Sequence, residues 1–141
     1  MTHPIDYTLL SPADTPRGFA ERYNRACQAL SAEGTVAQWA DHLMRYLPDG
    51  TVQTRDGKDG QKRYLADMYE KVKQNGIASI VASDYMITQL SDDFAIVRFR
   101  WELTSEDGSM SGGINSAYVL RRDADGWVAI CNLELGASHG P

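Results

Sequence analysis

Four residues of the sequence have side chains that could move or hold a proton in a catalytic site: Tyr23, His42, Asp84 and Glu134. Tyr23 lies within a row of apolar residues, and a phenol hydroxyl held in a dry pocket is a strong hydrogen-bond donor to a developing oxyanion. Asp84 and Glu134 have apolar neighbours in predicted strands, which suits a general acid or base. His42 falls at the edge of an apolar face and could work near neutral pH. For all four, an ordinary place in the core or at the surface is the alternative.

Six further residues could line a binding pocket. Aromatic side chains with a few polar tips suit a flat or ring-bearing ligand of modest size. They are also what an ordinary core needs. Asparagine is unusual within strands, and it could orient a ligand carbonyl. The candidates for ligand contact are Trp39, Tyr85, Phe99, Trp101, Asn115 and Tyr118.

Composition and spacing exclude several classes of protein. The sequence has no cluster of cysteine, histidine and carboxylate residues with metal-ligand spacing, so we expect no metal and no other cofactor. The net charge of −5 disfavours nucleic acid and anionic membranes as partners. No apolar run approaches the roughly 20 residues that span a bilayer. Residues 1–16 lack the pattern of a secretory signal, so the expected location is the cytoplasm.

Three segments with a helical period come first in the chain. A capping residue before Pro16 opens the first helix, and Gly34 ends it. The second helix is predicted to follow Thr35 and to stop at the Pro-Asp-Gly sequence of residues 48–50, and the third covers about 59–74. The residues expected on the buried face of the second helix are Val36, Trp39, Ala40, Leu43 and Leu47.

The apolar period then changes from helical to alternating. Strands are predicted at about 77–90, 94–104, 110–122 and 127–135, with a short candidate strand at 51–54. The strand at 94–104 has one dry side. Its apolar face carries Ala95, Val97, Phe99, Trp101 and Leu103, and its polar face carries Arg98, Arg100 and Glu102.

An antiparallel sheet that follows its helices is expected to curl around them and to leave an apolar hollow between the two layers. The predicted fold class is therefore α+β, with three N-terminal helices on the concave face of a curved, mainly antiparallel sheet. The length suits one domain, placed at residues 16–135, with an arm at 1–15 and a tail at 136–141.

The order of these elements resembles that of the nuclear-transport-factor-2-like superfamily over roughly residues 16–135. Three strings carry the resemblance: Arg-Tyr-Leu-Pro-Asp-Gly-Thr-Val at 45–52, Phe-Ala-Ile-Val at 94–97, and the strand–turn–strand at 118–127. The superfamily has a cone-shaped α+β fold and includes ketosteroid isomerases, polyketide cyclases, scytalone dehydratase, epoxide hydrolases and noncatalytic binding modules.

The resemblance implies roles for three positions. Tyr23 is similar in position to the isomerase tyrosine that donates a hydrogen bond to the oxyanion. Thr54 stands where that family has its carboxylate base, and Ser116 stands near its second oxyanion donor, a neutral aspartic acid. Proton transfer of the isomerase kind would therefore need a base from elsewhere in the chain.

Two functions are expected from these observations. The first is a protein that binds a small hydrophobic or aromatic molecule and could act as a cofactor-independent isomerase, cyclase or dehydratase. The second is a noncatalytic dimeric module for a ligand or a protein partner. The superfamily often dimerises through the outer face of its sheet, so Arg98, Arg100 and Glu102 are predicted at a homodimer interface; a solvated face or an anion site is the alternative.

Overall fold

The strands of this protein form one six-stranded sheet that curves over three helices, in the part of the chain that the computed structural model describes, residues 15–137. The helices are α2 (Pro16–Gln28), α3 (Ala32–Val36) and α4 (Lys58–Gln74). The strands are β1 (Trp39–Tyr46), β2 (Val52–Asp56), β3 (Ile77–Gln89), β4 (Phe94–Ser105), β5 (Met110–Asp123) and β6 (Gly126–Ala137). The predicted arm, apart from its last residue, and positions 138–141 of the predicted tail lie outside the described residues.

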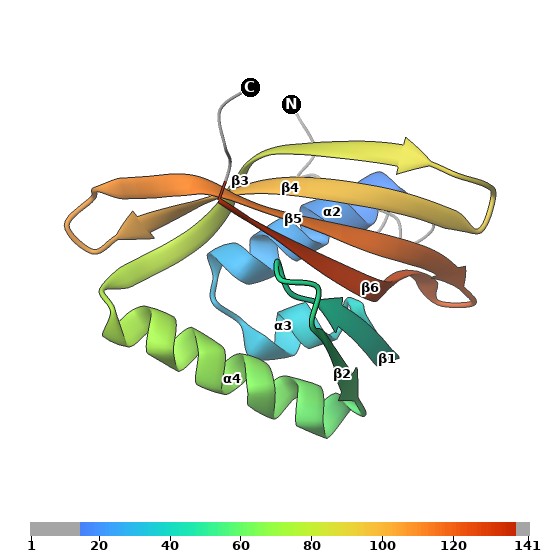
Figure 1. The fold of residues 1–141 in the computed structure, drawn as a ribbon, viewed down its shortest axis with the longest axis horizontal. Coiled ribbons are helices and arrows are strands. Elements are labelled where there is room, and N and C mark those ends of the chain that lie inside the picture. Colours follow the sequence, from blue (N-terminus) through green and yellow to red (C-terminus); the bar gives the residue numbers. More distant parts are fainter. Residues whose placement is uncertain (1–14, 138–141) are drawn as a thin grey trace, which may run out of the picture.

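The sheet has the strand order β2-β1-β6-β5-β4-β3. Neighbouring strands are antiparallel except β1 and β6, which are parallel. Register shifts interrupt the pairings of β3 with β4, β4 with β5 and β5 with β6. Such bulges bend and twist strands, and Figure 1 shows the long strands β3 to β6 sweeping over the helices. The predicted fold class is confirmed.

Helix α2 begins where its cap predicts. Thr15 Oγ1 accepts a hydrogen bond from the N–H of Gly18 at 3.0 Å, which satisfies a free donor of the first turn. The helix ends at Gln28, earlier than predicted, and Leu30 turns the chain with a positive φ of 51°. Ser31 then caps the short helix α3.

The predicted second helix is wrong over most of its length, because residues 39–46 form strand β1. Trp39 pairs with Ala129 of β6, whereas Met44 pairs with Cys131. β1 therefore has more residues between these two pairs than β6 has, and the extra residues form a bulge. The bulge interrupts the alternation of a strand and leaves buried residues at helix-like spacing.

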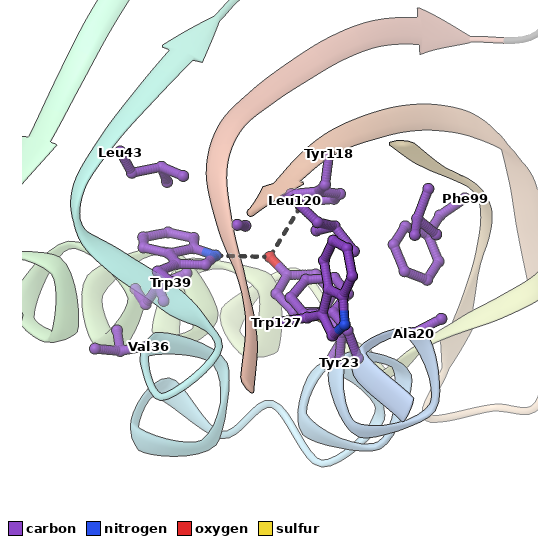
Figure 2. Close-up of a cluster of buried hydrophobic side chains, with 14 of the residues drawn as sticks. Ala20, Tyr23, Val36, Trp39, Leu43, Phe99, Tyr118, Leu120 and Trp127 are labelled. Atoms are coloured by element: carbon purple, nitrogen blue, oxygen red, sulfur yellow. Dashed lines mark hydrogen bonds between the residues drawn. The ribbon is translucent and has the colours of Figure 1, made fainter. Parts of the chain in front are cut away.

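A cluster of buried aromatic side chains joins α2 to the inner face of the sheet. Phe99 stacks on Trp101 with ring centroids 4.7 Å apart and meets Tyr23 at 5.7 Å. The rings of Tyr23 and Tyr118 are 4.8 Å apart, and Figure 2 shows both with Phe99 between the two layers. This packing fixes two phenol hydroxyls inside the cone.

In residues 15–137, the helices include none that is both long enough and apolar enough to cross a membrane.

Candidate functional site

A pocket of about 200 Å³ lies between the helices and the inner face of the sheet, and we call it the interior pocket. Its apolar wall consists of Leu65, Met68, Ile80, Trp101, Leu103 and Ile114. Its polar floor consists of Arg45, Ser116, Tyr118 and Glu134. Tyr23, Cys27, Trp39 and Tyr69 complete the lining. Pockets for drug-sized ligands have volumes of about 300 Å³ or more. The interior pocket is smaller than this, so it suits an occupant of one or two rings.

The strand register explains why the polar floor gathers in one place. Asn132 of β6 is opposite Tyr118 of β5 on one side and Arg45 of β1 on the other. Two residues further along, Glu134 is opposite Ser116. Alternate residues of a strand share a face, so all these side chains project from neighbouring positions on the inner face.

A chain of hydrogen bonds crosses the back of the pocket and ends at Tyr118. The indole N–H of Trp39 donates to Tyr23 Oη at 3.1 Å, and Tyr23 O–H donates to Tyr118 Oη at 2.9 Å. Figure 2 draws both bonds. The hydroxyl hydrogen of Tyr118 has no acceptor among the described residues. Tyr118, rather than Tyr23, is therefore the phenol with a hydrogen left to donate.

Ser116 repeats this arrangement beside Tyr118. The indole N–H of Trp101 donates to Ser116 Oγ at 2.7 Å. Because an indole can only donate, the serine oxygen is the acceptor. Its own hydrogen has no acceptor in the described part of the chain. The floor thus carries two neighbouring hydroxyl donors.

Glu134 and Arg45 are the charged residues of the interior pocket. Arg45 Nη2 lies 3.6 Å from Glu134 Oε1, too far for a good hydrogen bond, and Arg45 Nε is buried with no partner in the described structure. The hydrogen bonds around Asn132 orient its amide nitrogen toward Glu134 Oε1 at 2.9 Å. Burial raises the pKa of the Glu134 carboxyl, while Arg45 and Asn132 act in the opposite direction.

The other titratable groups of the pocket stay neutral at physiological pH. Burial raises the pKa values of Tyr23, Tyr69 and Tyr118 above that of a free phenol. Burial also raises the pKa of the Cys27 thiol to about 12, so this cysteine is not a nucleophile near neutral pH. These groups therefore act as hydrogen-bond donors or as packing.

The structure brings five of the predicted site residues together and leaves the others outside. The interior pocket is lined by Tyr23, Trp39, Trp101, Tyr118 and Glu134. Phe99 is fully buried behind Trp101, as part of the core.

Asp84, Tyr85, Asn115 and an edge of Phe99 line a separate hollow of about 250 Å³, together with Met86, Arg98 and Arg100. A bulge in β3 explains the position of Asp84. Asp84 pairs with Arg100 on the outer face, whereas Ala82 pairs with the inward-facing Trp101. The side chains of Asp84 and Glu134 therefore do not share a site.

His42 lies on the outer side of β1, where its Nδ1 contacts the Asp56 carboxylate. It lines an open hollow of about 720 Å³ that also includes Lys58, Arg121 and Asp123. This hollow is larger than the interior pocket, but both of its basic side chains already have partners: Lys58 Nζ donates to the carbonyl oxygens of Val36 and Trp39, and Arg121 pairs with Asp123. We therefore take the interior pocket as the candidate site.

Arg45 is a residue of the candidate site that was not predicted from the sequence. The predicted helix over residues 35–47 gave Arg45 no relation to the sheet. In the strand β1, Arg45 lies two residues after the fully buried Leu43 and so on the same face. Its guanidinium carbon lies 5.5 Å from the ring centre of Tyr64. An alternating reading of residues 43–46 would have found it. No group of three or more histidine, cysteine or acidic residues that could hold a metal ion occurs in residues 15–137.

Comparisons with known proteins agree with this architecture. A family model described as NTF2-like protein (DUF6841) matches residues 15–132. No curated protein matches the sequence. An NTF2-like protein with a cystatin-like fold from Novosphingobium aromaticivorans is 18% identical with a TM-score of 0.63, over 84% of this chain and 79% of that one.

Two other solved structures carry functional descriptions. A proposed aromatic ring hydroxylase from Novosphingobium aromaticivorans is 15% identical with a TM-score of 0.62, over 99% of this chain and 94% of that one. A proposed dehydratase of the NTF2-like family from Streptomyces avermitilis is 18% identical with a TM-score of 0.59, over 82% and 88%. At these identities the likeness shows the fold alone.

Proposed function

Because the chain belongs to the family of NTF2-like proteins whose model covers residues 15–132, we propose that it binds a small ring-bearing molecule in the interior pocket. The observation that carries this proposal is a pocket of about 200 Å³ with an aromatic and aliphatic wall and a floor of uncommitted hydrogen-bond donors. An apolar pocket with a few convergent polar groups is the usual form of a small-molecule site.

We expect one- and two-ring compounds to raise the unfolding temperature of the wild-type protein. A ligand that binds only the folded state stabilises it by about 2.7 kcal/mol at 100 times its Kd. Replacing Leu103, which lines the interior pocket, by tryptophan should fill the pocket and abolish the shift. The measurement is a thermal-shift screen followed by calorimetric titration of the compounds that bind.

The matched control for this screen is Ile87→Trp. Ile87 is also half-buried against the core, but it does not line the interior pocket. This variant should keep the ligand-induced shift. A shift that survives in Leu103→Trp would place the ligand elsewhere, and a panel that shifts neither protein would contradict the proposed function.

An acid–base enzyme is the second candidate function, and Glu134 favours it. A buried carboxyl with a raised pKa beside the Tyr118 hydroxyl pairs a proton-moving group with a hydrogen-bond donor. Asp84 and His42 lie outside the pocket and do not serve this chemistry. Mass spectrometry of the bound compounds separates the two functions, because a binding module returns its ligand unchanged.

A second copy of the chain is the partner that the outer face of the sheet fits best. This face is apolar at its centre and charged toward β4. The half-buried apolar residues on it are Met44, Ile96, Val119, Val128, Ile130 and Leu133. In the β4 part of this face, Glu102 pairs with Arg100 at 3.6 Å, which leaves Arg98 without an ion pair among the described residues. Apolar sheet faces of this kind are often covered in oligomers.

We expect sedimentation to give twice the chain mass of 15.7 kDa. Val119 lies between Ile96 and Cys131 at the centre of the outer face, so Val119→Asp should dissociate the dimer. Met110→Asp is the control, because Met110 is 67% exposed at the start of β5, away from that centre. A wild-type protein that sediments as a monomer at high concentration would refute the dimer.

We also propose that the protein is located in the cytoplasm. Both cysteines, Cys27 and Cys131, are free thiols, as expected of a protein in a reducing compartment.

A further inference from the structure

The floor of the interior pocket has more hydrogen-bond donors than acceptors. The oxygens of Tyr118 and Ser116 accept hydrogen bonds from other side chains, and their own hydroxyl hydrogens have no acceptor among the described residues. Arg45 adds a guanidinium that the protein uses only in part, with a buried Nε that has no partner. An occupant with acceptor oxygens would satisfy this surplus.

The guanidinium favours a carboxylate over a single carbonyl oxygen. Arginine presents paired N–H groups whose spacing matches the two oxygens of a carboxylate. Its present partner, Glu134 Oε1, lies at 3.6 Å and holds it loosely. A ligand carboxylate could therefore approach Arg45 while the Tyr118 and Ser116 hydroxyls donate to its oxygens.

A second carboxylate beside Glu134 would be costly if both were ionised. Two like charges that share one guanidinium in a largely apolar site repel each other, so one of them takes up a proton. Glu134 is the group that can take up this proton. Its other contact is a hydrogen bond from the Asn132 amide, and a neutral Glu134 carboxyl can replace that bond by a hydrogen bond to the ligand.

We propose, on the basis of the proposed function, that the ligand of the interior pocket is a small ring-bearing monocarboxylic acid. It binds as the carboxylate to Arg45, Tyr118 and Ser116, and its binding places a proton on Glu134.

The surroundings of Glu134 support this assignment of the proton. The polar groups that face it from the packed elements are Arg45 of β1, Ser116 and Tyr118 of β5, Asn132 of β6, Cys27 and Tyr23 of α2, and Tyr69 of α4. Of these, Arg45 alone is charged near neutral pH. Burial raises the pKa of Glu134 already in the free protein. Glu134 therefore takes up a proton more readily than an exposed glutamate does.

Proton uptake by Glu134 on binding fixes the sign of the pH dependence of Kd. Binding that takes up a proton weakens as the pH rises, by up to tenfold in Kd per pH unit above the pKa of Glu134 in the free protein. Below that pKa, Glu134 is already protonated and Kd is constant. Carboxylic acids ionise near pH 4, so between about pH 5.5 and about pH 8.5 the ligand itself stays ionised and contributes no change.

The test is calorimetric titration of the full chain with benzoate and phenylacetate, and with benzamide and phenylacetamide as neutral isosteres. We expect the acids to bind at least tenfold more tightly than the amides at pH 6, and Kd for the acids to rise with pH. The measured binding heat should differ between phosphate and Tris buffers, because the buffer releases the proton that the complex takes up. Glu134→Gln should bind the acids with a Kd that no longer depends on pH.

Two variants test the donors. Arg45→Met should remove the preference for acids over amides, and Tyr118→Phe, which keeps the ring, should weaken both. Circular dichroism shows whether each variant is folded. Amides that bind as tightly as acids, or an acid Kd that does not change with pH in the wild type, would overturn the carboxylate proposal while leaving the proposed function intact. If no acid or amide binds and other ring compounds also fail, the proposed function fails with it.

Discussion

Replacing Phe99 by alanine is expected to lower the free energy of unfolding by about 3–5 kcal/mol. The Phe99 ring is 1% exposed, stacks on Trp101 at 4.7 Å and meets the edge of Tyr118 at 5.7 Å. Truncation removes these contacts and leaves a cavity that the paired strands cannot easily close. Because domains of this kind are stable by only about 5–15 kcal/mol, denaturant unfolding curves will resolve the change.

Phe94→Ala is the matched control, because it removes the same atoms from the same strand. Phe94 is 41% exposed at the start of β4, so its loss should cost less than about 1 kcal/mol. If Phe99→Ala cost no more than Phe94→Ala, the aromatic cluster would be able to repack around the cavity. The pocket wall formed by Trp101 would then not depend on a rigid layer behind it.

The parts of the fold that could be predicted from sequence are those with one uninterrupted period. In β4, Val97, Phe99 and Trp101 alternate with Arg98 and Arg100, and the structure buries the first set and exposes the second. Alternation over a whole strand fixes which face is dry without knowledge of the neighbouring strands. A helical period placed Tyr23 on the buried stripe of α2 in a similar way.

Bulges limited the prediction of the catalytic candidates. Asp84 was expected to share a face with Ala82 and Met86, but the bulge at Ser83 turns Ala82 inward and leaves Asp84 on the outside with Met86. One extra residue exchanges the two faces of every residue beyond it. The sequence near Ser83 has no glycine or proline to mark such a point.

The polar floor of the pocket depends on a pairing that no local pattern reveals. Arg45 lies beside Asn132 only because β1 runs parallel to β6, at the far end of the chain. Periodicity within a segment says which face is buried but not which strand is the neighbour. The site residues of β5 and β6 were accessible to sequence analysis, whereas their contact with Arg45 required the structure.

Replacing Gln61 by methionine is expected to lower the free energy of unfolding by about 2–4 kcal/mol. Gln61 is fully buried at the start of α4, and its Nε2 donates to the carbonyl oxygens of Ala40 in β1 and Arg55 in β2, each at 2.8 Å. Methionine has a similar size but no donor, so one buried and one partly buried carbonyl group lose this partner at about 1–3 kcal/mol each. Part of this cost is offset, because methionine also removes the buried Gln61 Oε1, which has no partner among the described residues. Denaturant unfolding measures the loss, and hydrogen exchange should quicken in β1 and β2 more than in β4 and β5.

Lys62→Met is the control, because Lys62 is the next residue of α4 and is exposed. It should change the free energy of unfolding by no more than about 0.5 kcal/mol. Equal stabilities of the Gln61 and Lys62 variants would mean that pairing with β2 and β6 is enough to hold β1 in place. The expected difference in stability concerns residues 39–46, which were predicted to be helical. An α-helix satisfies its own carbonyl groups, whereas a bulged strand needs hydrogen-bond donors from other elements. The Gln61 amide thus supplies donors that a strand over residues 39–46 needs and a helix would not.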